Sequence, residues 1–135
     1  MKVIKTMLVA MAILSMNGAA YAAPAPKACP SVEKLKTIVF NEAQYTVSGY
    51  VAYQRGIYGT EQMWGFGLGP FLRAQSPQEA IESAQKVLAT LSGQPKPHLI
   101  QNVWACVYGV EGFYVAGAVT PPDLFSSFVT LMHHD

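Results

Sequence analysis

The stretch Leu99–Gly109 (LIQNVWACVYG) constrains the fold of this chain more than any other part of the sequence. Read with a period of two residues, it has apolar side chains on both faces of a strand, which is typical of a strand in the middle of a sheet. We therefore expect Leu99–Gly109 to be a central strand. Gly109 and Gly112 then bracket a turn, and Phe113–Val119 is expected to complete a hairpin.

The first 22 residues have the pattern of a signal peptide. Lys2 and Lys5 precede an apolar run, Met7–Met16, and the small residues around Ala22 suit cleavage after that position. The run is too short for a lone transmembrane helix, which needs roughly 20 apolar residues, and no later stretch supplies one. We therefore expect a periplasmic or secreted protein with no membrane span after cleavage.

Residues 23–135 are expected to form a single domain, because 113 residues suffice for one hydrophobic core but not for two. Without Lys2 and Lys5, seven basic residues face eight acidic ones, a formal net charge of −1. No basic patch indicates a nucleic-acid partner. In an exported chain, the two cysteines, Cys29 and Cys106, are expected to form a disulfide; the alternative is two free thiols.

Two further strands are expected before the main helix. Tyr45–Arg55 alternates as a half-buried strand, and Met63–Leu68 places Trp64, Phe66 and Leu68 on one face and glycines on the other. A strand face made of Gly65 and Gly67 admits a close neighbour. That neighbour is either a helix or neighbouring backbone that packs tightly, and we favour the covering helix, or it is an aromatic or flat ligand.

The clearest helix is predicted for Pro77–Ser92. Ser76 is a suitable N-cap, Pro77 occupies the first helical position, and Glu79 stands three residues after the cap. A shorter helix is expected to begin after Ser31, tied to the sheet by the disulfide. A last helix is favoured over a strand within residues 121–133. Together these elements predict an α+β fold: an antiparallel sheet of about four strands, built from two hairpins, packed against one main helix.

No arrangement of residues in the sequence indicates catalysis. Histidine occurs only at positions 98, 133 and 134, without metal-ligand spacing, and no nucleophile elbow or phosphate-binding motif is present. We therefore expect a protein that is not an enzyme and has no catalytic residues.

Aromatic residues crowd one predicted hairpin. They can simply pack the small sheet, or they can bind a flat apolar ligand. Tyrosine can ligate haem iron, methionine can assist, and arginine can pair with propionates. The candidate ligand-binding residues are Tyr50, Tyr53, Tyr58, Met63, Trp64 and Arg55.

Four features in order resemble a known family: the signal peptide, Cys29-Pro30-Ser31 at the mature start, a middle rich in tyrosine and glycine, and Trp104–Tyr108 near the end. The sequence is similar to small exported proteins of intracellular bacterial pathogens, one of which is described as hemin-binding. The resemblance implies hemin as a ligand, and it assigns no iron ligand to a residue here. The alternative is a protein-interaction module, such as an inhibitor or envelope-associated protein, that meets another envelope or host protein.

Overall fold

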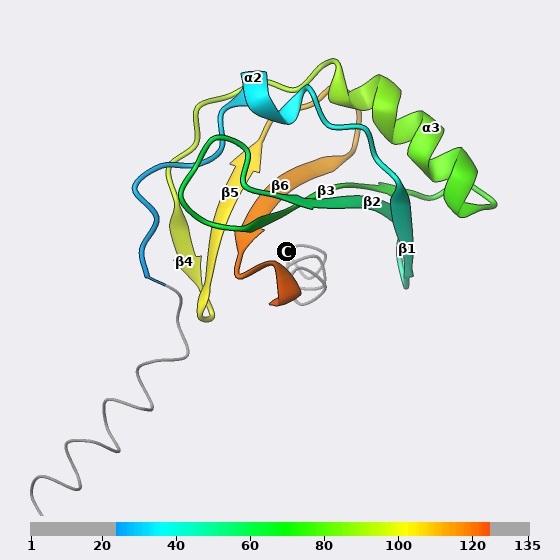
Figure 1. Cartoon of the computed structure of the whole chain (residues 1–135). Helices are drawn as coiled ribbons and strands as arrows, with labels where there is room; N and C mark the ends of the chain where they lie inside the picture. Colours follow the sequence, from blue (N-terminus) through cyan, green and yellow to red (C-terminus); the bar gives the residue numbers. More distant parts are fainter. Residues whose placement is uncertain (1–23, 125–135) are drawn as a thin grey trace, which may run out of the picture.

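The computed structural model describes residues 24–124, which form one antiparallel sheet with helices over one of its faces (Figure 1). The six strands lie in the order β1-β2-β3-β6-β5-β4. In chain order, the elements are α2 (Val32–Leu35), β1 (Glu42–Thr46), β2 (Gly49–Gly56), β3 (Trp64–Phe71), α3 (Pro77–Leu88), β4 (His98–Ile100), β5 (Val103–Tyr108), β6 (Val115–Thr120) and the 3-10 turn η1 (Pro122–Leu124). The predicted signal peptide and most of residues 121–133 lie outside the described residues.

The prediction of a four-stranded sheet packed against a main helix was wrong, because the sheet has six strands and dominates the fold. Two stretches that were expected to be single strands are hairpins. Tyr45–Arg55 is interrupted by the turn at Val47 and Ser48, which separates β1 from β2. Leu99–Gly109 is interrupted at Gln101 and Asn102, which separate β4 from β5.

Backbone conformation explains the second interruption. Gln101 and Asn102 have φ angles of 46° and 70°, and two consecutive positive φ angles are the mark of a tight two-residue hairpin turn. The three residues before this turn then become the edge strand β4. Consequently β5 lies next to the sheet edge, and the central strands are β3 and β6 instead of the expected Leu99–Gly109.

The helix α3 begins as its sequence predicts. The Ser76 hydroxyl accepts a hydrogen bond from the Glu79 N–H at 3.2 Å, and the Glu79 carboxylate accepts one from the Gln75 N–H at 2.9 Å. The helix packs against β1, β2 and β3. Its buried side chains, Ala80, Ala84 and Leu88, are mostly small, so the helix backbone can lie close to the sheet.

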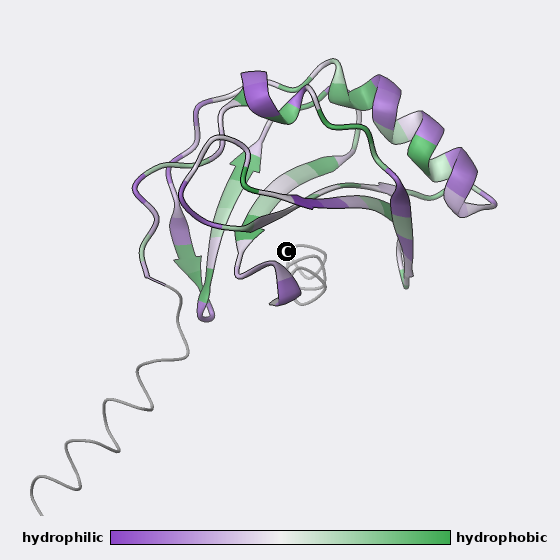
Figure 2. Ribbon diagram, viewed as in Figure 1, coloured by the Kyte–Doolittle hydropathy of each residue, from purple (hydrophilic) through white to green (hydrophobic). Residues whose placement is uncertain are grey.

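Each face of the sheet has its own buried cluster. Trp64, Phe66 and Leu68 share a face, as predicted, and pack in the larger cluster with the helix side chains. The smaller cluster is Val51, Tyr53, Val103, Ala105 and Val119. Figure 2 shows hydrophobic colour along β5 and β6, whereas the outer strand β1 is hydrophilic.

The expectation that α3 covers the glycine face was wrong, since α3 packs on the opposite face, beside Phe66 and Leu68. At Gly65 the close neighbour is an aromatic ring from the next strand. A Cβ atom at Gly65 would lie 2.7 Å from the Tyr53 hydroxyl oxygen. Glycine at position 65 therefore makes room for the Tyr53 side chain.

The disulfide between Cys29 and Cys106 confirms the predicted pairing. It attaches the segment before α2 to the second-outermost strand, β5. The buried Tyr108 hydroxyl, two residues further along β5, donates a hydrogen bond to the Pro30 carbonyl oxygen. A covalent bond and a buried hydrogen bond thus fix the N-terminal segment on the helix-covered face of the sheet.

Candidate functional site

The structure does not bring the six candidate ligand-binding residues together. Tyr50, Tyr58 and Trp64 belong to the cluster on the helix-covered face. Tyr53 is 3 % exposed and lies in the cluster on the opposite face. Met63 is half-exposed just before β3, and the Arg55 guanidinium lies 3.2 Å from the Asp123 carboxylate at the surface. A single flat ligand could not touch all six side chains.

Three of these aromatic side chains already use their polar atoms within the protein. The Tyr53 hydroxyl donates to the Pro122 carbonyl oxygen at 3.1 Å, and the Tyr58 hydroxyl donates to the Gln54 carbonyl oxygen at 2.6 Å. The Trp64 indole N–H donates to the Thr60 hydroxyl at 2.9 Å. Burial raises the pKa of Tyr58, which disfavours the phenolate form that ligates iron.

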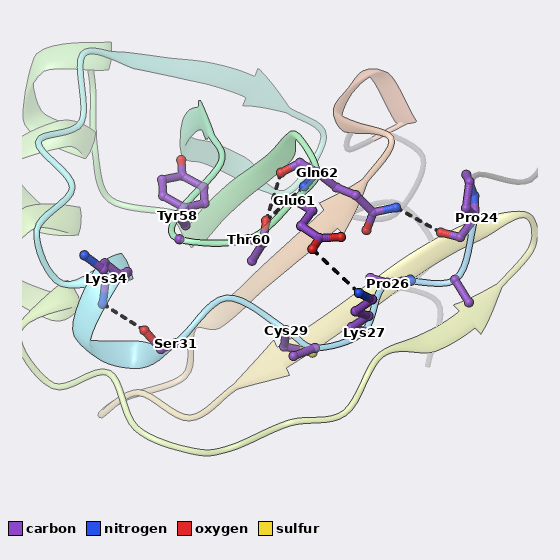
Figure 3. A pocket seen from close by; sticks show the side chains of 13 residues that line it. Pro24, Pro26, Lys27, Cys29, Ser31, Lys34, Tyr58, Thr60, Glu61 and Gln62 are labelled. Carbon is purple, nitrogen blue, oxygen red and sulfur yellow. Dashed lines mark hydrogen bonds and ion pairs between the residues drawn. The ribbon is translucent and has the colours of Figure 1, made fainter.

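A pocket of about 510 Å³ lies between the N-terminal segment and the β2–β3 loop (Figure 3). Residues 24–29, Ser31 and Lys34 form one side, and residues 58–62 form the other. Of the six candidates, only Tyr58 lines this pocket. Its volume falls in the range of roughly 300–1,000 Å³ that is typical of ligand sites.

Polar contacts connect the two sides of this pocket. The Gln62 side-chain amide donates to the Pro24 carbonyl oxygen at 3.0 Å, and the Lys27 ammonium lies 3.7 Å from the Glu61 carboxylate (Figure 3). The Thr60 hydroxyl accepts from the Gln62 N–H at 3.2 Å as well as from Trp64. The pocket therefore combines an apolar wall of prolines and alanines with the ammonium groups of Lys27 and Lys34.

A second surface lies at the end of the sheet where β3 stops. Val47 is in the β1–β2 turn, Leu72 follows β3, and Phe113 is in the β5–β6 turn. Their side chains expose 99 %, 76 % and 104 % of the reference area. Because β1, β2, β3, β6 and β5 are neighbours in that order, these three segments meet along one end of the sheet. We call Val47, Leu72 and Phe113 the apolar end.

A cleft of about 490 Å³ opens between two parts of the apolar end. Leu72 and Phe113 stand on its two sides, and Arg73 also lines it. Phe71 and Tyr114 support the cleft, with ring centroids 4.8 Å apart. This surface was not predicted from the sequence, although an apolar residue beside a turn glycine, as in Gly112-Phe113, is a signal that indicates it.

Within residues 24–124, no group of three or more His, Cys, Asp or Glu side chains is placed to hold a metal ion. No helix in that part of the chain is both long enough and apolar enough to cross a membrane.

Comparison with known proteins gives a family but no activity. No curated protein and no solved structure matches the chain. A family model described as "Domain of unknown function (DUF4949)" matches residues 28–133, a span that begins just before Cys29 and includes all six strands that the structure describes. The chain therefore belongs to the DUF4949 family.

Proposed function

We propose that this chain is an exported, non-enzymatic interaction module that binds another envelope or host protein through its apolar end. The observation that carries the proposal is the presence of three exposed apolar residues from three separate segments, Val47, Leu72 and Phe113, at one end of the sheet. Single exposed apolar residues are ordinary, but adjacent ones mark interaction surfaces.

The neighbouring residues suit a protein partner. A cleft between Leu72 and Phe113 can receive an apolar side chain, and the Arg73 guanidinium beside it can pair with a carboxylate. Aromatic residues and arginine are enriched among the side chains that dominate binding energy at protein interfaces. The Phe71 and Tyr114 rings pack against each other at a tilt of 34° and both line the cleft, so this part of its wall is already ordered and less entropy is lost on binding.

Periplasmic or secreted localisation remains part of the proposal. The disulfide between Cys29 and Cys106 supports it, because disulfides persist in oxidising compartments and are rare in the cytosol of most organisms. The basic start, short apolar run and small residues of positions 1–22 also support it.

Site-specific photo-cross-linking in the producing cells tests the proposal. A photoreactive amino acid at position 113 should give a discrete protein adduct, and the change Leu72→Ser should reduce its yield. The same probe at Ile57, which is half-exposed in the β2–β3 loop at the other end of the sheet, is the control. Equal adducts at positions 57 and 113, or none at 113, would contradict the proposal.

Hemin binding is a second candidate, favoured by the pocket in Figure 3. Its volume of about 510 Å³, its apolar wall and the ammonium groups of Lys27 and Lys34 suit a flat apolar molecule that carries carboxylates. The resemblance to a family of small exported proteins, one of which is described as hemin-binding, suggests the same ligand. In this proposal hemin lies beside the Tyr58 ring, and its iron need not be bound by that buried hydroxyl.

A Soret titration of the mature protein tests this second candidate. Hemin should give a saturable spectral change, and the combined changes Lys27→Ala and Lys34→Ala should weaken binding by about 10-fold or more. Tyr50→Phe, which lies outside the pocket, should leave the titration unchanged and serves as the control. A non-saturable change, or equal affinity in all variants, would rule out hemin at this pocket.

A further inference from the structure

The face of the sheet away from α2 and α3 is buried more fully than η1 alone can account for. On this face, Val51 and Tyr53 of β2 and Val103 and Ala105 of β5 are each at most 3 % exposed. Figure 1 shows the η1 turn, in red-orange, on this side of the sheet, and its contacts are with β3 and β6. Because β2 and β5 are three strand spacings apart, about 14 Å, a turn of three residues cannot cover both strands.

Burial along β5 indicates where the covering group lies. Val103, Ala105 and Val107 are alternate residues of this strand and therefore share the face. Val103 and Ala105 are 3 % and 1 % exposed, whereas Val107 is 45 % exposed. Neighbouring strands shield the flanks of such side chains but leave their tips open, so nearly complete burial requires a group above the sheet. That group lies over Val103 and Ala105 and stops short of Val107.

The chain itself leads to this face. Two contacts from β2 hold η1 there: the Tyr53 hydroxyl donates to the Pro122 carbonyl oxygen at 3.1 Å, and the Arg55 guanidinium lies 3.2 Å from the Asp123 carboxylate. The sequence continues from η1 with the apolar stretch FSSFVTLM, residues 125–132. A stretch of this length spans about 12 Å as a helix and about 26 Å when extended, so it can reach from β2 towards β5. The family model also continues to residue 133.

We propose that residues 125–132 pack across this face as a second layer, on the side of the sheet opposite α3. We call this segment the C-terminal cover. Phe125, Phe128 and Met132 recur at intervals of three and four residues, so in the helix that the sequence favours they share one side. That apolar side meets the buried cluster of the sheet, and the polar side faces solvent.

The middle of the face suits a segment that packs closely. Gly67 and Gly117 lie opposite each other in the β3–β6 register, and neither has a side chain, so large side chains of the C-terminal cover can approach the sheet backbone. A second copy of the chain could also supply apolar side chains. A segment that begins beside the face has the advantage of tethering, which gives an effective concentration on the order of millimolar for a short linker.

A spin label on the polar side of the C-terminal cover tests its position. Both native cysteines are in the disulfide, so Thr130→Cys introduces a single thiol for a nitroxide. In the mature protein, this label should broaden the amide NMR signals of Val51 and Ala105 more strongly than that of Glu82, which is exposed on α3. A nitroxide on Glu82→Cys is the matched control and should leave the Val51 and Ala105 signals less affected than the Thr130→Cys label does.

The same experiment identifies a different occupant. Equal broadening on the two faces, or no broadening at Val51 and Ala105, overturns the proposal. Mixing spin-labelled chains with separate isotope-labelled chains detects contacts between molecules. Broadening at Val51 and Ala105 in that mixture would assign the covering group to a second copy, and it would overturn the proposal as well.

A charge on the apolar side of the C-terminal cover provides a second measurement. Phe128→Asp should lower the melting temperature by about 10 °C or more, because the carboxylate would lose its hydration against the sheet. Ser127→Asp introduces the same charge on the polar side and should melt close to the wild type. A Phe128→Asp chain that fails to fold while Ser127→Asp folds supports the proposal too, whereas equal melting temperatures of the two variants contradict it.

Discussion

The side chain of Gln85 on α3 holds the backbone at Phe40 across 45 residues of sequence. Its amide oxygen accepts a hydrogen bond from the Phe40 N–H at 3.0 Å. Its amide nitrogen donates to the Ile38 carbonyl oxygen at 2.7 Å. One amide therefore satisfies a donor and an acceptor of the segment that joins α2 to β1, where Ile38 and Phe40 enter the core.

Replacing the Gln85 amide should lower the free energy of unfolding more than a substitution at the surface does. Gln85→Ala leaves the Phe40 N–H and the Ile38 carbonyl without this partner, so we expect the free energy of unfolding to fall by about 1–3 kcal/mol. Gln78→Ala on the exposed side of the same helix should change it by less than about 0.5 kcal/mol. Urea denaturation of both variants checks the difference, and equal effects would show that the Gln85 contacts contribute little.

The disulfide should contribute a large part of the stability. Closing a loop with a sequence separation of 77 residues is worth up to about 4.5 kcal/mol in the chain-entropy account. Cys29→Ser and Cys106→Ser should each lower the unfolding midpoint, and the double variant should resemble the single ones. Intact mass after alkylation without reductant should show no modified cysteine in the wild-type protein.

A charge in the helix–sheet interface should prevent stable folding. Ala84 is completely buried in the same cluster as Phe66 and Leu68, where a carboxylate would lose its hydration. Ala84→Asp should therefore lower the free energy of unfolding by more than about 3 kcal/mol. Gln78→Asp introduces the same carboxylate on the exposed face and should melt close to the wild type. Thermal unfolding of the two variants, followed by circular dichroism, measures the contrast.

The contact between Gly65 and Tyr53 should appear as an energetic coupling. A methyl group at Gly65 would come within 2.7 Å of the Tyr53 hydroxyl oxygen, so Gly65→Ala should cost about 1–3 kcal/mol by overpacking. In the Tyr53→Ala background the same change should cost clearly less, because the ring is gone. A double-mutant cycle measures this coupling. If the changes in unfolding free energy of the two single variants simply add, the Tyr53 ring is not the reason for glycine at position 65.

Alkaline pH should destabilise the fold through its buried tyrosines. Burial raises the pKa of Tyr108 and of Tyr58 above the value of about 10 in an unfolded chain. Their contribution to stability is therefore complete below pH 10, and it is lost as the pH rises from there through the folded-state pKa. Urea midpoints measured between pH 8 and 11 should fall less steeply for Tyr108→Phe than for Tyr45→Phe, whose ring is exposed.

Local patterns predicted the helix start at Ser76, the shared face of Trp64, Phe66 and Leu68, and the disulfide, because each depends on neighbouring residues or on cysteine chemistry. The strand count was wrong for a physical reason. A two-residue turn at Gln101 and Asn102 contains no glycine, so the apolar pattern continues across it and resembles one long strand.

The candidate site grouped aromatic residues that are close in the sequence but do not share a face. Tyr50 and Tyr53 are an odd number of positions apart in β2, so the two-residue period of a strand places them on opposite faces of the sheet. The apolar end could not be predicted from any one segment, because Val47, Leu72 and Phe113 become neighbours only through the strand order.

The position of the disulfide in the chain also determines when the fold can be completed. Cys106 is synthesised 77 residues after Cys29, and it lies in β5, the last but one of the strands within residues 24–124. Until β5 has emerged, Cys29 has no partner, and the N-terminal segment lacks both its covalent attachment and the hydrogen bond from Tyr108 to Pro30. The segment around Cys29 is therefore made early but is attached to the sheet only late in synthesis. Any truncation before β5 leaves Cys29 as a free thiol.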